Sequence, residues 1–258
     1  MALISCDFFS EALQVGTSMT VVLPQATEEQ IGVQGGGDAD RPPPVLYLLH
    51  GLSDDHTAWT RYTSIERYAT ARGLAVVMPA VGRSFYADEV HGHPYWRFVS
   101  HELPTVVSSF FRVSTAREDT FVAGLSMGGY GALKLALTHP ERFAAAASLS
   151  GVADIGLIRE RPERSELHER VFGGRIGDAD DLFALLEAAD PASLPRLFVA
   201  CGLDEPLLLD ANRRLAARAR ERGVPVTTDE RPGEHEWGLW DAVVKDVVAW
   251  LPLGATGP

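Results

Sequence analysis

TFVAGLSMGGYGALKLALTH, residues 120–139, joins a short apolar run to a longer helix-patterned run through a serine flanked by glycines. The apolar run predicts a buried strand, and the run after the serine predicts a helix. Between them, Gly124, Ser126 and Gly128 form a Gly-x-Ser-x-Gly pattern. A turn this tight leaves no room for Cβ atoms beside the serine, and glycine removes them. The stretch therefore predicts a serine hydroxyl raised above the end of a strand, at the head of a helix.

Further short apolar runs alternate with helix-patterned segments along the chain. They are VLYLL (45–49), AVVM (75–78), AAAASLS (144–150) and RLFVA (196–200). Apolar runs of strand length indicate strands buried on both faces, as in a parallel sheet covered by helices. Two earlier strand-like segments, around 4–9 and 17–23, predict an antiparallel entry into that sheet. The predicted fold class is α/β, with a central, mostly parallel sheet and helices on both faces.

The chain has 258 residues, a length that one α/β domain commonly fills, so we expect a single domain over 1–258. Residues 26–44 contain three consecutive glycines and three consecutive prolines, which predicts an exposed loop. Residues 151–193 are rich in Arg, Glu and Asp. We expect them to form an insertion or cap-like segment over the carboxyl ends of the strands, where binding elements usually lie.

The formal net charge of −12 would repel phosphate backbones and anionic lipid surfaces. We therefore expect a small-molecule substrate, with neither nucleic acid nor a membrane as partner, and a homo-oligomer is left open. The N-terminal MALISCDFFSEALQVG lacks the basic region of a secretory signal, and no apolar run reaches the roughly 20 residues of a membrane span. Cys6 and Cys201 lie far apart in the sequence. These features predict a cytoplasmic protein without disulfides.

A serine between a strand and a helix in this way is typical of the α/β-hydrolase fold, in which serine, acid and histidine follow in that chain order. Of eight histidines, His139, His168 and His235 follow the serine. His139 ends the helix after Ser126, and His168 lies in the charged segment. His235 lies in a loop before the final helical stretch, where the base of this fold belongs. We predict Ser126 as nucleophile and His235 as its base.

The acid should follow the next-to-last core strand, which is RLFVACG, ending at Gly202. Asp204 and Glu205 come directly after it, and both cannot face one imidazole. The usual spacing in this fold places the acid three residues after the glycine, which favours Glu205. Asp204 is the commoner residue type and would serve if the loop were shifted by one residue. We prefer Glu205, keep Asp204 as the alternative, and expect the other carboxylate to be a solvated loop charge.

Acyl transfer also needs two N–H groups directed at the carbonyl oxygen as it becomes an oxyanion. In this fold one N–H belongs to the residue after the nucleophile, here Met127. The other comes from the loop after an early strand, where Gly51 lets the N–H of Leu52 turn inward. His50 in the same loop is expected to hold the loop by hydrogen bonds and to have no catalytic role.

His91 and His93 have a spacing that could suit a metal, but no further ligand cluster lies near them in the sequence. A solvated loop is the better interpretation, and no metal is predicted.

Four longer segments carry a family resemblance. They are LLHGLSDDHTAW, GRSFYADEVHGHPYWRFVSHELP, GLSMGGYGALKLAL and PGEHEWGLWD. With them the chain resembles, from near residue 4 to about 251, the esterases that include esterase D, S-formylglutathione hydrolases, tributyrin esterases and feruloyl esterases. The tributyrin-esterase type is the most similar. The resemblance implies an α/β-hydrolase that cleaves short-chain acyl esters without a cofactor, with Ser126, an acid at 204 or 205 and His235.

One departure from that family concerns the acid. The family typically has Glu-Asp at the two positions where this chain has Asp204 and Glu205, so the acid would be one methylene longer.

The expected activity is that of a serine carboxylesterase that works through an acyl-enzyme intermediate. The alternatives are a thioesterase of the S-formylglutathione type, a feruloyl or acetyl esterase, and an acyltransferase that uses the same residues. A binding protein without catalysis is disfavoured, because binding alone has no need for serine, histidine and acid together.

Overall fold

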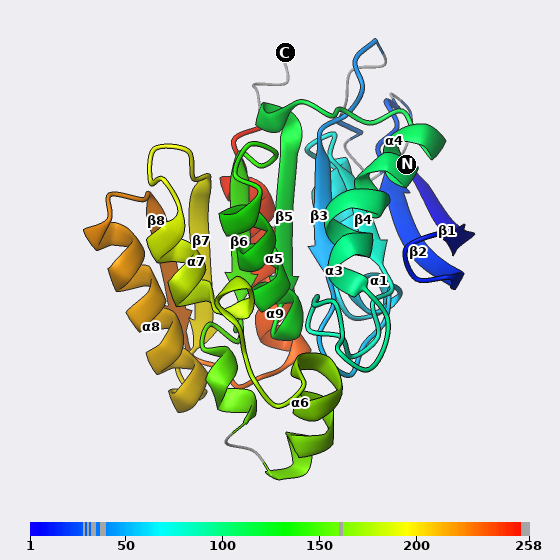
Figure 1. Cartoon of the computed structure of the whole chain (residues 1–258). Coiled ribbons are helices and arrows are strands. Elements are labelled where there is room, and N and C mark those ends of the chain that lie inside the picture. Colours follow the sequence, from blue (N-terminus) through cyan, green and yellow to red (C-terminus); the bar gives the residue numbers. More distant parts are fainter. Residues whose placement is uncertain (28, 30, 32–34, 37–39, 160–161, 254–258) are drawn as a thin grey trace.

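The structure is a computed structural model that describes residues 1–27, 29, 31, 35–36, 40–159 and 162–253. A sheet of eight strands forms the centre of this described part, in the order β1-β2-β4-β3-β5-β6-β7-β8 (Figure 1). The strands are β1 (Ala2–Ser10), β2 (Val15–Leu23), β3 (Val45–Leu49), β4 (Ala75–Pro79), β5 (Thr120–Leu125), β6 (Ala145–Leu149), β7 (Arg196–Gly202) and β8 (Val226–Arg231). β2 pairs antiparallel with β1 and β4, and the other neighbours are parallel. The predicted α/β class, the mostly parallel sheet and its antiparallel entry are confirmed.

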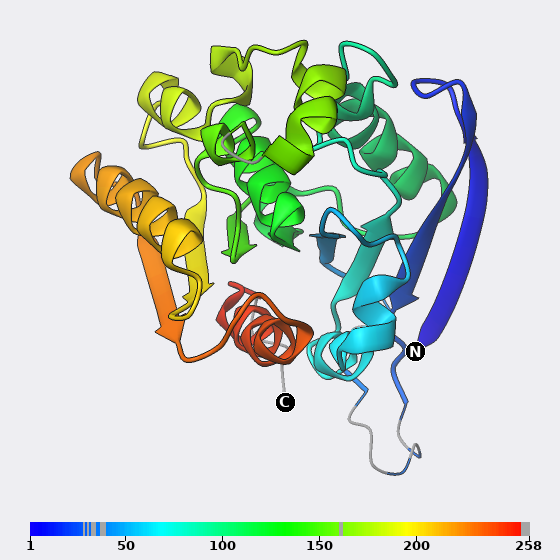
Figure 2. The ribbon, with the colours of Figure 1, turned by 90° about the horizontal axis from the view of Figure 1, so that it is seen from below.

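Helices cover both faces of the sheet (Figure 2). One face carries α1 (Ala58–Tyr62), α2 (Ile65–Thr70) and α9 (Trp237–Trp250). The other carries α3 (Tyr95–Arg97), α4 (Leu103–Phe110), α5 (Met127–Thr138), α7 (Leu182–Ala188) and α8 (Pro206–Glu221). Because apolar residues pack from both sides, every residue of β3, β4, β5 and β6 is buried. Burial on both faces explains why these strands appear in the sequence as continuous apolar runs.

Helix α8 begins six residues earlier than the arginine-rich run 212–222 suggests. Pro206 occupies its first turn, where the missing N–H costs no hydrogen bond and the fixed φ suits a helix. Because α8 begins early, the loop between β7 and α8 is short, and Glu205 lies directly before the first residue of the helix.

Residues 151–193 divide into two parts. The first part contains α6 (Ser165–Phe172) and lies beyond the carboxyl ends of the strands (Figure 1). The second part forms α7, which packs beside α5 on the face of the sheet. Of the predicted loop 26–44, several residues lie outside the described part, and among the described ones Ile31 is fully exposed.

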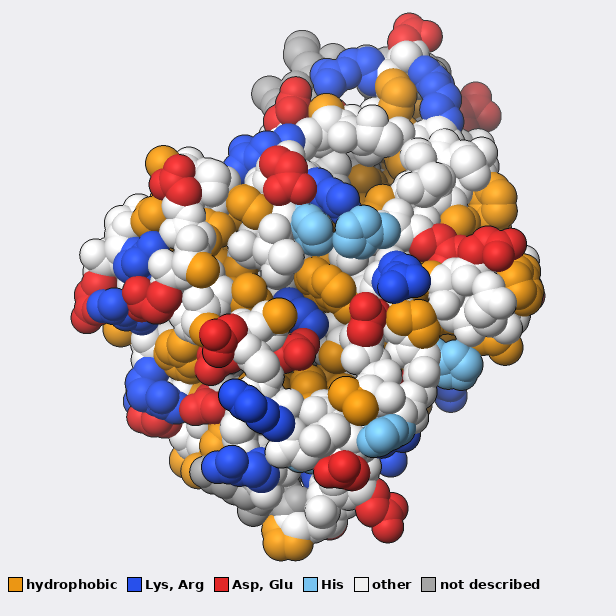
Figure 3. Space-filling model, in the orientation of Figure 1, with side chains coloured by type: hydrophobic (Ala, Val, Ile, Leu, Met, Phe, Trp, Pro, Cys, Tyr) orange, Lys and Arg blue, Asp and Glu red, His pale blue; other side chains and the backbone are white. Residues whose placement is uncertain are grey.

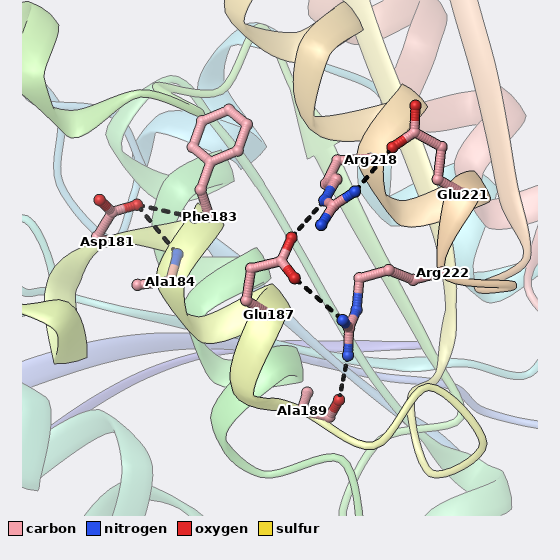
Figure 4. Close-up of polar contacts among 8 residues, drawn as sticks. All are labelled: Asp181, Phe183, Ala184, Glu187, Ala189, Arg218, Glu221 and Arg222. Carbon is pink, nitrogen blue, oxygen red and sulfur yellow. Dashed lines mark hydrogen bonds and ion pairs between the residues drawn. The ribbon is translucent and has the colours of Figure 1, made fainter.

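Ion pairs tie α7 to α8 (Figure 4). The carboxylate of Glu187 accepts hydrogen bonds from Arg218 and Arg222, and Arg222 also donates to the carbonyl oxygen of Ala189. Arg218 of α8 and Arg222 at its end therefore share one acidic partner of the same molecule. On the face drawn in Figure 3, acidic and basic side chains are likewise interspersed. None of the helices in the described ranges is long and apolar enough to cross a membrane.

Candidate active site

The turn between β5 and α5 holds Ser126 in an unusual backbone conformation. Its φ is +53° and its ψ is −115°, outside the regions that residues with a side chain normally adopt. The flanking glycines make the turn sterically feasible. A Cβ at Gly124 would lie 2.3 Å from the oxygen of Gly128, and one at Gly128 would lie 2.3 Å from the oxygen of Leu49. The predicted strand, glycine-flanked turn and helix are therefore present, and Ser126 stands at the head of α5.

Ser126, His235 and Glu205 form one chain of hydrogen bonds. The Oγ atom of Ser126 lies 2.9 Å from Nε2 of His235, and Nδ1 of His235 is hydrogen-bonded to Oε2 of Glu205. Since an ionised carboxylate can only accept, Nδ1 carries the proton and Nε2 is free to accept the serine hydroxyl. This is the arrangement in which a histidine can take a proton from a serine.

Glu205 is buried, with 7% of its surface exposed. Burial opposes its ionisation, but the hydrogen bonds from His235 and Ser150 outweigh burial and hold the pKa of the Glu205 carboxyl below its usual value. The backbone N–H of Gly202 donates to Oε1 at 3.0 Å as well. Glu205 therefore remains ionised at neutral pH beside the imidazole.

Asp204 makes no such bond to the imidazole; it is exposed, as expected for a solvated loop charge, and it also hydrogen-bonds to the backbone of a neighbouring loop. Its Oδ2 accepts a hydrogen bond from the N–H of Gly233 at 3.1 Å, and its own N–H donates to the oxygen of Gly233 at 3.2 Å. Asp204 thus binds the loop that carries His235. The physical reason is that the β7 and β8 loops lie side by side, because β7 and β8 are paired strands.

The loop after β3 lies next to the serine. A Cβ at Gly51 would stand 3.8 Å from Cβ of Ser126, and Leu52 follows in the same turn. His50 holds this loop as expected: Nδ1 lies 2.7 Å from the oxygen of Gly51, and Nε2 accepts from the N–H of Val81 at 3.1 Å. Burial lowers the pKa of His50 to about 4, so the ring is neutral and structural.

Met127 is fully buried and is the first residue of α5, where backbone N–H groups have no partner within the helix. Leu52 and Met127 therefore lie on the two segments expected to supply the oxyanion donors.

A cavity of about 500 Å³ opens onto Ser126 and His235. Most of its lining is apolar and comes from the segment after β6 and the start of α8: Val152, Leu157, Ile158, Pro206, Leu207 and Leu208. The charged groups of the wall are Arg164, Asp204, Glu205 and Glu234. His139 stacks on Trp96 and His168 packs near Phe172, so neither of these histidines joins the site.

Sequence reasoning missed two residues behind the acid. The hydroxyl of Ser150 donates to Oε1 of Glu205, and the indole of Trp240 packs against His235 with ring centroids 4.8 Å apart. Ser150 follows an apolar strand and has no distinguishing sequence context. Trp240 belongs to the specific HEWGLW segment, which could have pointed to it.

The family model described as "Putative esterase" matches residues 10–251. An acetyl esterase of Caldicellulosiruptor saccharolyticus is 30% identical, over 97% of this chain and 98% of the relative. An S-formylglutathione hydrolase of Paracoccus denitrificans is 27% identical, over 80% of this chain and 81% of the relative. Among solved structures, the fluorophosphonate-binding serine hydrolase F of Staphylococcus aureus is 34% identical with a TM-score of 0.85, over 97% of this chain and 98% of that chain.

Proposed function

The chain belongs to the esterase family, and we propose that it hydrolyses short-chain carboxylic esters with Ser126 as nucleophile, His235 as base and Glu205 as acid. One observation carries the assignment of residues, namely the continuous hydrogen-bond chain from Ser126 through His235 to Glu205 beside an apolar cavity. The acetyl esterase relative supports the substrate class.

In this mechanism the Oγ atom of Ser126 attacks the ester carbonyl carbon while its proton passes to Nε2 of His235. Glu205 keeps Nδ1 protonated and stabilises the imidazolium that forms. The N–H groups of Leu52 and Met127 hold the negative carbonyl oxygen. The C–O bond then breaks, and the alcohol leaves with the proton from His235. A water molecule attacks the acyl-enzyme by the same steps in reverse and releases the acid and free Ser126.

A panel of p-nitrophenyl acetate, butyrate and octanoate tests this proposal, with Ser126→Ala as the matched control. We expect kcat/KM to fall from acetate or butyrate to octanoate. Ser126→Ala should keep its circular dichroism spectrum and lose activity on the order of a million-fold, because only the nucleophilic hydroxyl is removed. Higher kcat/KM for octanoate than for butyrate contradicts the short-chain proposal, and near-normal turnover by Ser126→Ala contradicts the mechanism.

The second candidate is thioester hydrolysis, favoured by the S-formylglutathione hydrolase relative. S-formylglutathione added to the same panel separates the two: a kcat/KM well above that for the oxygen esters would make the thioester the preferred substrate.

We also propose a cytoplasmic location. Cys6 and Cys201 are both free thiols, as is usual in reducing compartments. Fractionation of the native host with an antibody to the chain would test it.

A further inference from the structure

Ser150 stands immediately after β6 in a strained backbone conformation. Its φ is +47°, in the left-handed region that residues with a Cβ rarely adopt. Its side chain is buried, with 1% of the residue's surface exposed. A glycine would adopt this conformation without strain. Strain that persists at a buried side chain beside a reaction centre suggests that the side chain itself has a task.

The hydroxyl of Ser150 links two elements of the site. It donates to Oε1 of Glu205 at 2.6 Å and accepts from the indole Nε1–H of Trp240 at 3.2 Å. An indole N–H can only donate, so the hydroxyl proton is directed at the carboxylate. Oε1 of Glu205 thus accepts from two donors, the hydroxyl of Ser150 and the N–H of Gly202. Oε2 of Glu205 faces His235.

We propose that Ser150 is a positioning residue of the reaction: with Trp240 behind it, Ser150 holds one oxygen of Glu205 so that the other is aligned with Nδ1 of His235. This rests on the function proposed above. A glutamate has one more rotatable bond than an aspartate and must lose more freedom to hold a single orientation. In this chain the acid is a glutamate, and the hydrogen bonds to Oε1 restrict the rotation of its side chain.

The other ionisable groups around this pair include Arg164, Asp204 and Glu234 in the wall of the same cavity. Asp54, in the loop after β3, interacts with His235, and burial raises the pKa of its carboxyl. The thiol of Cys201 lies 3.9 Å from Oε1 of Glu205, and burial raises its pKa to about 12, so it is neutral. Without the Ser150 hydroxyl, the Glu205 carboxylate loses a hydrogen bond that favours its ionised form, so Glu205 takes up a proton at higher pH.

The test compares Ser150→Ala and Ser150→Gly with Ser148→Ala. Ser148 is also fully buried at the end of β6, but its hydroxyl has no hydrogen-bond partner among the described residues. With p-nitrophenyl butyrate we expect both Ser150 variants to lower kcat about 10- to 100-fold, as for loss of a hydrogen bond to a charged group, with KM changed less than about twofold. The acid limb of their pH–rate profiles should move to higher pH. Ser148→Ala should behave as the wild type.

Ser150→Gly separates the hydroxyl from the backbone, because it relieves the positive φ and removes only the side chain. A glycine variant within about twofold of wild-type kcat, with an unmoved acid limb, overturns the proposal. Equal losses in Ser148→Ala overturn it too, because they would show a general packing effect. If Ser150→Ala does not fold, Ser150→Gly still decides.

A readout independent of turnover is the NMR resonance of the Nδ1 proton of His235, assigned by its loss in His235→Ala. We expect it to shift in both Ser150 variants and to remain in place in Ser148→Ala. An unchanged resonance in the Ser150 variants overturns the positioning role even if the enzyme is an esterase. A shifted resonance in a protein that hydrolyses no ester would instead retain the positioning role and refute the proposed function.

Discussion

At the scale of single residues, neighbouring carboxylates have different surroundings. Glu205 is buried and hydrogen-bonded to His235, whereas Asp204 is exposed and binds the backbone of Gly233. Sequence spacing favoured Glu205 and left Asp204 open. The contacts supply the physical difference, because only Glu205 receives donors on both oxygens while it faces the imidazole.

Glu205→Gln should therefore lower kcat about ten-thousand-fold at neutral pH, because an amide neither stabilises the imidazolium nor fixes its tautomer. Asp204→Asn keeps an oxygen that can accept from Gly233, so we expect a loss of less than about tenfold. Steady-state kinetics with p-nitrophenyl butyrate measures both. The reverse ranking would make Asp204 the acid, and comparable large losses would mean that both carboxylates are needed.

At the scale of elements, the segment between β6 and β7 serves two purposes. Its first part lines the cavity beside Ser126, and its last part, α7, covers α5, the helix that begins at the nucleophile. The side chain of Asp181 begins α7 by accepting from the N–H of Phe183 at 2.8 Å and that of Ala184 at 3.3 Å (Figure 4). These N–H groups would otherwise lack partners within the helix.

Asp181→Ala should lower the free energy of unfolding by about 1 kcal/mol, the usual cost of losing an N-cap. Urea denaturation followed by circular dichroism measures it as a lower midpoint with an unchanged slope. Asp178→Ala, an exposed substitution in the preceding turn, is the matched control and should change stability by less than about 0.5 kcal/mol. Equal effects in the two variants would refute the capping role.

At the scale of the whole molecule, the sheet brings the loops after β3, β5, β7 and β8 to one end, and the neutral His50 ring is part of this assembly. Its pKa is about 4 in the folded protein against 6.5 ordinarily. Between these values the unfolded chain binds the additional proton, so the free energy of unfolding falls as pH falls from 6.5 towards 4. Above pH 6.5 this contribution is fully present.

The pKa difference corresponds to about 3 kcal/mol across that window. We expect His50→Gln, which cannot titrate, to lose less stability than the wild type between about pH 7 and about pH 5. Urea denaturation at the two pH values measures how much the free energy of unfolding of each protein changes with pH. This comparison holds whatever the stability of the variant at neutral pH. Parallel pH profiles would show that His50 does not stay neutral by burial.

The sequence by itself determined the sheet class, the turn at Ser126 and the histidine at 235. Strand-length apolar runs imply burial on both faces, and a glycine-flanked serine between strand and helix implies one local geometry. The first two signals are local, so one chain segment contains each of them, whereas His235 was identified by its order in the chain after Ser126. The resemblance to the esterases, which implied the substrate class, also rests on contiguous sequence motifs.

Only the tertiary structure decided how the acid is held. Ser150 follows β6, Glu205 follows β7 at the start of α8, and Trp240 lies in α9. They meet because β6 and β7 pair and α9 packs against both strands. The role of Asp204 and the division of residues 151–193 between cavity wall and helix layer have the same origin. Such contacts depend on which distant segments fold against one another, and the spacing of residues within one segment cannot predict them.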